Sequence, residues 1–296
     1  MELVRAESVE SLDGGVFIHG GTEVVPLLRD RILTAERLLD VREVVPRGVS
    51  STTEEQRLPN GTYSGVTIGA GTTLAELEVD PEIPEALREA CRLAASPQLR
   101  NMGSVGGNLL QATRCWYWRL KFPCRLHRVG DGWGDRCHAR DGEHREHAIF
   151  ANDFCASAHP SDVAAALLAL GATLRTSRRE LTIAELYRLP DEGNRATTTL
   201  EPGELILELE VARPDASVYL KAMDRKRWAF PLVGVAAART GGQTRIALAA
   251  AAPIPWLLAG EVDSATPLPQ TAYKVDIARA LVERARTELD RQLVQP

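Results

Sequence analysis

One short stretch, GSVGGN at residues 103–108, constrains the fold of this chain more than any other. It holds three glycines within five positions, although Val105 and the following Leu109 and Leu110 are apolar enough to be buried. Glycine allows positive φ and lets another group approach the backbone closely. A second such stretch, HGGTE at residues 19–23, also follows an apolar segment. Because successive backbone N–H groups in such turns form concavities for phosphate oxygens, the two stretches together could grip one diphosphate from two sides.

Neither glycine pair alone distinguishes a phosphate-binding turn from an ordinary tight turn. Thr22, Ser104 and Asn108 place hydroxyl and amide groups beside the glycines, which favours anion binding. Neither stretch has the spacing of a Rossmann dinucleotide fingerprint or of a P-loop. The pattern therefore argues against NAD in a Rossmann domain and against ATP.

Length and composition are those of an ordinary globular protein of two or three domains, with 296 residues, 44% hydrophobic and 25% charged. The net charge of −5 argues against a general nucleic-acid binder, which needs a basic surplus to neutralise phosphates. The first residues lack the basic and apolar regions of a secretory signal, and the most apolar stretch, residues 246–260, is broken by Pro253 and Pro255. We therefore expect a cytoplasmic enzyme or enzyme subunit without a membrane span.

Hydrophobic periodicity separates ordered stretches from one irregular segment. A helix is predicted around Cys91, which shares an apolar face with Leu87 and Ala94. Ser161 is the predicted N-cap of an apolar helix that leads into a strand. From residue 113 to residue 158, in contrast, tryptophan, histidine, arginine, glycine and cysteine are intermixed without a period.

The C-terminal part is predicted to combine a sheet with a long helix. Residues 205–214, 217–225 and 231–253 alternate like the strands of an antiparallel sheet. Residues 271–296 form a predicted amphipathic helix, whose apolar side carries Val275, Ala278, Leu281, Val282, Ala285 and Leu289. The polar stretch 189–204 resembles a linker, so a domain boundary is expected between about residues 180 and 200.

Six stretches, in order along the chain, resemble the motifs of one known family. They are FIHGGTEVVPLLR, TIGAGTTLAEL, SPQLRNMGSVGGNLL, HPSDVAAALLALGATL, GELILELEVARP and YLKAMDRKRWAFPLVGVAAA. These motifs are similar to those of the FAD-binding subunit of molybdenum hydroxylases, a family that includes the flavin subunits of xanthine dehydrogenase, carbon monoxide dehydrogenase and aldehyde oxidoreductases. The resemblance covers essentially the whole chain.

The resemblance implies an α+β fold in two parts. The first is an FAD-binding domain at residues 1–185, with two subdomains at about 1–57 and 58–185 and a cysteine-rich loop at 113–158. The second, residues 186–296, is a small α+β domain with an antiparallel sheet and helices, similar to the C-terminal domain of the carbon monoxide dehydrogenase flavoprotein.

The resemblance also implies which residues bind FAD. Those of the first glycine-rich stretch, which wraps the diphosphate, are Phe17, Ile18, His19, Gly20, Gly21, Thr22, Glu23 and Val24. Those of the second, which lies along the flavin and its diphosphate, are Ser104, Val105, Gly106, Gly107 and Asn108. On this interpretation Gly103, Gly106 and Gly107 leave the backbone bare where the dinucleotide lies against it. Many members carry aspartate where this chain has Glu23.

Four further residues are implied to lie at the cofactor. Asp162 resembles a cofactor contact, and Leu205 or Ile206 together with Lys221 align with positions near the isoalloxazine ring. The residues alone favour a different interpretation, in which Asp162 caps a helix and Lys221 is a solvated strand lysine.

Four of the five cysteines fall in the irregular segment, whereas Cys91 is expected to be a buried helix residue. Their spacing, C-x8-C-x12-C-x17-C, runs from Cys115 through Cys124 and Cys137 to Cys155. It lacks the paired CxxC knuckles of a zinc ribbon, and without a secretory signal a disulfide framework is not expected. The residues alone leave an iron–sulfur cluster and a zinc ion as alternatives.

The resemblance favours the iron–sulfur cluster. A subset of the family, including 4-hydroxybenzoyl-CoA reductase and a bacterial aldehyde oxidoreductase, carries an extra 4Fe-4S cluster in an insertion between the GGN and SD motifs, where this chain has its four cysteines. Five histidines lie near this segment, and we expect solvated loop residues, with an electrostatic contact to the cluster as the alternative: His127, His138, His144, His147 and His159.

The resemblance implies an FAD-containing electron-transfer subunit. Electrons would pass from 2Fe-2S clusters of a small partner subunit through FAD to a soluble external acceptor, while a large molybdopterin-binding subunit oxidises the organic substrate. No nucleophilic triad or carboxylate pair is placed for acid–base chemistry, so no catalytic residue is assigned and the chain alone is not expected to oxidise that substrate. Two alternatives are a free-standing flavoprotein with a structural zinc in the cysteine loop, and a non-enzymatic interaction module whose glycine stretches are only turns.

Overall fold

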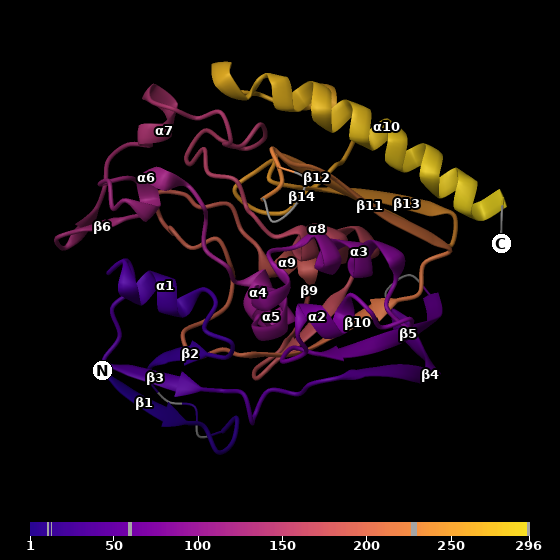
Figure 1. The fold of residues 1–296 in the computed structure, drawn as a ribbon, viewed down its shortest axis with the longest axis horizontal. Coiled ribbons are helices and arrows are strands. Elements are labelled where there is room, and N and C mark those ends of the chain that lie inside the picture. Colours follow the sequence, from indigo (N-terminus) through magenta and orange to yellow (C-terminus); the bar gives the residue numbers. More distant parts are fainter. Residues whose placement is uncertain (11, 13, 59–60, 226–229, 295–296) are drawn as a thin grey trace.

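Two antiparallel sheets with helices between them organise the molecule (Figure 1). The computed structural model describes residues 1–10, 12, 14–58, 61–225 and 230–294. The first sheet has the strand order β4 (Val49–Leu58), β5 (Gly61–Gly69), β10 (Ile206–Ala212), β8 (Thr173–Thr176) and β9 (Glu180–Thr182). The second has the order β11 (Ala216–Ala222), β12 (Val233–Thr240), β13 (Gln243–Ala249) and β14 (Trp256–Leu257).

Two smaller sheets lie on the left of the view in Figure 1, on the side away from the C-terminus of the chain. A parallel sheet near the N-terminus has the order β1 (Glu2–Arg5), β3 (Arg37–Asp40) and β2 (Val16–Ile18). A short hairpin in the cysteine segment pairs β6 (Arg128–Val129) with β7 (Gly132–Trp133).

Most of the described helices are short. In chain order they are α1 (Val24–Arg29), α2 (Leu74–Leu77), α3 (Glu85–Leu93), α4 (Pro97–Met102), α5 (Val105–Leu109), α6 (Trp116–Arg119), α7 (His138–Asp141), α8 (Asp162–Leu170), α9 (Ile183–Leu186) and α10 (Tyr273–Val294), with single turns of 3-10 helix at Val262–Ser264 and Pro269–Thr271. None of them is long and apolar enough to cross a membrane.

Helix α8 lies at the centre of the fold, with all of its residues buried. Ser161 begins it as predicted, because its Oγ accepts a hydrogen bond from the Ala164 N–H at 2.9 Å. Gly171 ends it with a φ of 67°, a left-handed conformation that glycine adopts without steric cost. A helix that is apolar on all sides has to be covered all round. Helix α3 and strands of both large sheets pack against it.

The second sheet is covered on both faces, as β12 illustrates. Val233 and Val235 belong to the apolar cluster under α10, whereas Ala236 and Ala238 belong to the main core around α8. This division follows from the strand, whose successive side chains point to opposite faces. The predicted C-terminal helix is confirmed as α10, and its buried apolar residues are Ala278, Val282, Ala285 and Leu289.

The three segments expected to alternate like one antiparallel sheet divide between two sheets. Residues 206–212 form β10, which pairs with β5 and β8 in the first sheet, while β11, β12 and β13 form the second. Alternation of apolar residues marks a strand but does not choose its partner. The α+β class with an antiparallel C-terminal sheet is confirmed. The division of the chain near residue 185 stays a prediction, and β10 lies in the sheet of the first part although it follows that boundary.

Candidate cofactor site

The first glycine-rich stretch connects β2 to α1. Gly21 has a φ of +70°, which favours glycine. A Cβ on Gly20 would lie 1.7 Å from the Met102 carbonyl oxygen at the end of α4. Gly20 is therefore explained by the close approach of α4, and Gly21 by the turn itself. Together they bring the start of α1 against the second glycine-rich stretch.

The second stretch begins a helix instead of forming a loop. Ser104 caps α5, and its Oγ accepts a hydrogen bond from the Gly107 N–H at 3.2 Å. A Cβ on Gly106 would lie 3.0 Å from the Ala70 Cβ, so a side chain there would enter the core. A Cβ on Gly107 would meet only the Ser104 Oγ, at 3.1 Å, and this glycine is exposed. Of these two glycines, Gly107 is the one whose missing side chain leaves room at the surface.

Two hollows meet at the glycine-rich stretches. The residues that line both are Thr22, Glu23, Ser104 and Gly107. The first hollow continues along Phe17, His19, Leu27, Val41, Val45, Leu205 and Ile206. The second continues along Ala94, Ser96, Leu99, Asn108, Arg114, Asp162 and Phe230. A dinucleotide has two halves joined by a diphosphate, so it fits this arrangement with its diphosphate at the shared residues.

His19 gives a second indication of a ligand. Its Nδ1 is buried without a hydrogen-bond partner among the described residues, and the residue lines the first hollow. Burial lowers the pKa of His19, and the nearby Arg42 and Arg47 lower it further. A buried polar atom without a partner costs about 1–3 kcal/mol. A cofactor atom that bonds to this nitrogen would remove that cost.

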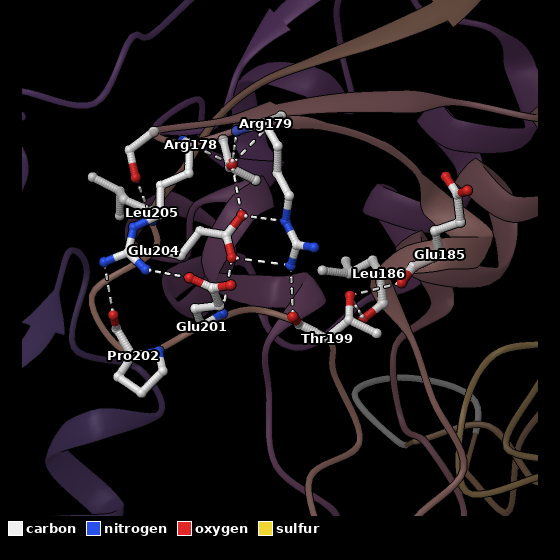
Figure 2. A network of polar contacts seen from close by, with 11 residues as sticks. Arg178, Arg179, Glu185, Leu186, Thr199, Glu201, Pro202, Glu204 and Leu205 are labelled. Carbon is white, nitrogen blue, oxygen red and sulfur yellow. Dashed lines mark hydrogen bonds and ion pairs between the residues drawn. The ribbon is translucent and has the colours of Figure 1, made fainter.

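Leu205 and Ile206 reach the first hollow from a turn that is held by charged side chains (Figure 2). Arg179 donates to both carboxylate oxygens of the buried Glu204, at 3.0 and 3.2 Å, and also to the Thr199 carbonyl at 2.7 Å. Burial alone would raise the pKa of Glu204, but the hydrogen bonds from Arg179, the Glu201 backbone and the Thr176 hydroxyl outweigh it and lower that pKa.

Asp162 and Lys221 form a buried ion pair. The Lys221 Nζ lies 2.9 Å from the Asp162 carboxylate and also donates to the Leu93 carbonyl at 2.9 Å. The Tyr219 hydroxyl donates to the other carboxylate oxygen. Burial raises the pKa of Asp162, and Lys221 and Tyr219 limit the rise. Lys221 is therefore not a solvated strand lysine, and Ser161, not Asp162, caps α8.

Glu23 joins the first glycine-rich stretch to the cysteine segment. Its carboxylate accepts hydrogen bonds at 2.6 Å from both Arg114 and Arg119, and a third at 3.1 Å from the Ala112 N–H. These two arginines flank Cys115 in the sequence. The Glu23 side chain thus has a structural role here, although the residue lines both hollows.

The four cysteines of the irregular segment line one small cavity. They share it with aromatic and polar residues, and the set includes Cys115, Cys124, Cys137, Cys155, Tyr117, Trp118, Phe154 and Ser157. All five cysteines are free thiols. Among the described residues, no group of three or more His, Cys, Asp or Glu side chains that could hold a metal ion is present.

Backbone N–H groups face the cysteine sulfurs. Burial raises the pKa of Cys115 to about 11, and the N–H groups of Trp118 and Tyr117 oppose this by lowering it. Burial also raises the pKa of Cys155 to about 12, against an opposing hydrogen bond with the Ser157 hydroxyl. Such N–H groups stabilise a thiolate, the form of cysteine that binds metal. The donor set therefore fits a thiolate-bound centre that displaces protons when it binds.

Three of the five histidines near this segment are buried, so the expectation of solvated loop residues is wrong for them: His144, His147 and His159. His144 Nδ1 lies 2.8 Å from the Ala139 carbonyl oxygen, and its Nε2 accepts from the Gln270 N–H at 3.2 Å. His147 Nε2 lies 3.2 Å from the Cys115 sulfur. Burial lowers the pKa of His147 to about 4 and that of His159 to about 3. The aperiodic sequence did not reveal this interior because aromatic and imidazole rings make up much of it, and its buried aliphatic residues, such as Ile149, follow no period.

Most of the predicted cofactor residues lie at the two hollows. Ile18, Val105 and Lys221 line neither hollow. Lys221 and Leu205, both expected near the isoalloxazine ring, therefore do not lie at one common hollow. The sequence reasoning missed several lining residues, which are Leu27, Val41, Val45, Ala70, Leu110, Ala112, Arg114, Glu204 and Phe230. Leu27, Ala70, Leu110, Glu204 and Phe230 lie within the quoted family motifs, which gave a signal for their segments, whereas Val41, Val45, Ala112 and Arg114 lie outside every motif.

Comparison with known proteins identifies the family of this chain. Residues 5–214 match the family model described as the FAD binding domain in molybdopterin dehydrogenase. The aldehyde oxidoreductase FAD-binding subunit PaoB of Escherichia coli (strain K12) is 34% identical over 264 residues, which cover 85% of this chain and 79% of that protein. The nicotinate dehydrogenase FAD-subunit of Eubacterium barkeri is 25% identical over 227 residues, which cover 73% and 58%.

Solved structures share the fold. A chain of the Cu,Mo-CO dehydrogenase in its cyanide-inactivated form superposes with a TM-score of 0.67 at 20% identity, covering 98% of both chains. A chain of quinoline 2-oxidoreductase from Pseudomonas putida 86 gives 0.64 at 17% identity, covering 99% of this chain and 97% of that one. With most of its length matched by the family model, the chain belongs to the FAD-binding proteins of the molybdopterin dehydrogenase family and is a component of an oxidoreductase.

Proposed function

We propose that the chain is the FAD-containing electron-transfer subunit of a molybdenum-dependent hydroxylase or dehydrogenase. It would pass electrons from the 2Fe-2S clusters of a partner subunit to an external acceptor. The observation that carries this proposal is the pair of hollows that meet at the two glycine-rich stretches, in a chain related to proteins named as FAD subunits. Bound FAD would supply one-electron uptake and two-electron release.

Different residues of the two hollows would bind the diphosphate, the adenine ring and the isoalloxazine ring of FAD. The backbone around Gly21, with the hydroxyl groups of Thr22 and Ser104 and the room left by Gly107, would hold the diphosphate. The first hollow has mainly apolar lining, which suits the adenine ring. The second contains Asp162 and adjoins the cysteine segment, so we assign the isoalloxazine ring to it. This assignment would place Leu205 and Ile206 at the adenosine half.

We propose a 4Fe-4S cluster for the four cysteines in preference to zinc. A tetrahedral zinc ion requires four sulfur ligands about 3.8 Å apart, from its Zn–S distance of about 2.3 Å. The described side chains form no group of that kind, although the four cysteines line one cavity. The cysteines of a 4Fe-4S cluster each bind a separate iron and therefore stand farther apart. The N–H groups that face the sulfurs also support thiolate ligation.

We propose that its partners are a large molybdopterin-binding subunit and a small 2Fe-2S subunit. Relatives are named as an FAD-binding subunit, a medium chain and a complex subunit, each of which denotes one component of a larger assembly. The soluble external acceptor and the cytoplasmic location stay predictions.

A visible spectrum of the purified chain, with iron and acid-labile sulfide analysis, tests the proposal. Flavin bands above a broad iron–sulfur shoulder, with about four irons and four sulfides per chain, are expected. Acid denaturation should release the flavin into the supernatant, because we expect FAD to be held noncovalently, His19 being the one side chain in the glycine-rich stretches that could form a flavin bond. Flavin with zinc and no iron under anaerobic preparation indicates the free-standing flavoprotein instead, and no chromophore indicates an interaction module.

A further inference from the structure

His147 occupies an unusual position beside the cysteines. Its side chain is buried, and its Nε2 lies 3.2 Å from the Cys115 sulfur. Its other ring nitrogen, Nδ1, is buried and has no hydrogen-bond partner among the described residues. We propose that His147 donates a hydrogen bond from Nε2 to the Cys115 sulfur and is thereby a positioning residue that sets the reduction potential of the iron–sulfur cluster. This inference rests on the cluster proposed above.

The orientation of the ring is fixed by contacts that do not involve a metal. The Trp116 ring meets the imidazole edge-on, with the centroids 4.9 Å apart and an interplanar angle of 84°. The His147 backbone N–H donates to the His144 carbonyl at 2.9 Å, and its carbonyl accepts from the buried Lys274 Nζ at 2.8 Å. The protein therefore aims Nε2 at the sulfur before any cluster binds.

The surroundings of the ring also select its tautomer. A neutral imidazole has one nitrogen that donates and one that accepts. No acceptor faces Nδ1 in the parts of the chain that the structure describes, so the proton belongs on Nε2, where a thiolate sulfur accepts it. Donation to a thiolate ligand withdraws negative charge from it and favours the reduced, more negative cluster. The presence of His147 should therefore raise the potential.

Cys115 differs from the other cysteines in its position as well. It lines a narrow cleft that shares Arg114, Pro160 and Phe230 with the second hollow of the cofactor site. His147 lines the same cleft. The hydrogen bond thus acts on the cysteine that lies toward the cofactor. The Cys155 thiol, in contrast, forms a hydrogen bond of 3.2 Å with the Ser157 hydroxyl in the buried interior.

The test compares two substitutions of His147 in the full chain prepared anaerobically. His147→Phe keeps a ring beside Trp116 and removes both nitrogens, whereas the amide nitrogen of His147→Gln can take the place of Nε2. The matched control is His127→Phe, because the His127 ring lies in the same segment and contacts the Arg128 carbonyl instead of a cysteine. The measurements are iron and sulfide per chain, the Fe–S stretching frequencies in resonance Raman spectra, and the cluster potential in a dye-mediated titration.

We expect His147→Phe to lower the cluster potential and shift the Fe–S stretch, His147→Gln to restore both toward wild type, and His127→Phe to change neither. A His147→Phe protein with wild-type iron, potential and stretch overturns the inference alone. If His147→Phe loses its iron, the result with His147→Gln is decisive. A retained cluster with a potential near that of wild type supports the inference, and loss of iron or a potential clearly below that of wild type overturns it. Wild-type protein without iron overturns the proposed cluster and this inference together.

Discussion

Gly106 and Gly107 are neighbours with different reasons to be glycine. A Cβ on Gly106 would lie 3.0 Å from the Ala70 Cβ and 3.1 Å from its carbonyl oxygen, whereas one on Gly107 would meet only a serine hydroxyl. Gly107→Val should therefore weaken FAD binding by about tenfold or more, about 1.4 kcal/mol, and leave the thermal midpoint of the flavin-free protein near that of flavin-free wild type. Gly106→Val should lower stability by about 1–3 kcal/mol because it overpacks the core. Released flavin per chain and thermal unfolding measure the two effects.

A matched control for these variants is Gly260→Val. A Cβ on Gly260 meets nothing within 4 Å, and the residue is exposed in the C-terminal part. Flavin content and thermal midpoint should both stay at the wild-type values. Full flavin content in Gly107→Val would contradict the placement of the diphosphate at the shared residues of the two hollows.

Lys274 is a buried cation without an acidic partner in hydrogen-bond range among the described residues. Its Nζ donates to the carbonyls of Glu146, His147 and Ala250 at 3.3, 2.8 and 2.7 Å. Burial lowers its pKa from 10.5 to about 7. Between these two pH values the unfolded chain binds more protons than the folded chain, so the contribution of Lys274 to stability rises with pH. The free energy of unfolding of wild type minus that of Lys274→Met should therefore increase from pH 7 to pH 10.

Urea unfolding at several pH values measures that difference. Lys274→Met should also be less stable than wild type, because the buried carbonyls of His147 and Ala250 lose their donor, at a cost of about 1–3 kcal/mol each. Arg284→Met is the control, since Arg284 is an exposed cation on the same helix. The free energy of unfolding of wild type minus that of Arg284→Met should not change over this pH range. If the corresponding difference for Lys274→Met is also constant, the prediction is contradicted.

For individual residues, the turns and helix caps could be predicted from the sequence, but the ion-pair partners that lie far away in the sequence could not. The turn at Gly21 and the cap at Ser161 depend on neighbouring residues, so short motifs identified them. The ion pairs of Glu23 join it to residues 91 and 96 positions away, and the partner of Lys221 is 59 positions away. A pattern within one segment carries no information about such contacts.

The structure of the cysteine segment, residues 113–158, could also be predicted only in part from the sequence. Its lack of aliphatic periodicity was visible in the sequence, but its interior of aromatic rings and buried histidines was not. Few aliphatic side chains are available to offset the entropy of ordering it, so metal–thiolate bonds should contribute much of its stability. Serine at Cys115, Cys124, Cys137 or Cys155 should therefore lower iron and sulfide content and increase proteolysis within residues 113–158. Much of the FAD should remain, because most residues of the two hollows lie outside the segment.

Cys91→Ala is the matched control for the four serine variants. Cys91 is fully buried in α3 and belongs to the main core, away from the cavity of the other four cysteines. Alanine is preferable to serine there, because a hydroxyl group would be buried without an assigned partner. Iron content should equal that of wild type. Unchanged iron in all four serine variants would instead contradict the cluster assignment.

For the whole molecule, the fold class and the C-terminal helix were predictable, because the α10 pattern extends over six turns and its predicted apolar side includes the buried Ala278, Val282, Ala285 and Leu289. The sheet to which β10 belongs was not predictable. Its pairing with β5 brings residues 208–212 against residues 65–69, more than a hundred positions away. This pairing sets Leu205 and Ile206 beside the first hollow, so the site itself depends on a long-range contact.

The last prediction concerns assembly. The described residues provide two hollows that fit a dinucleotide and a cavity lined by four thiols, but we assign no residue that would oxidise an organic substrate. The chain should therefore co-purify with a larger molybdopterin-binding subunit and a small 2Fe-2S subunit when all three are co-expressed. Size-exclusion chromatography with metal analysis of each peak checks this, and substrate-dependent dye reduction should appear only in the complex. Substrate oxidation by a peak that contains this chain alone would contradict the subunit role, since electrons would then enter without the partner centres.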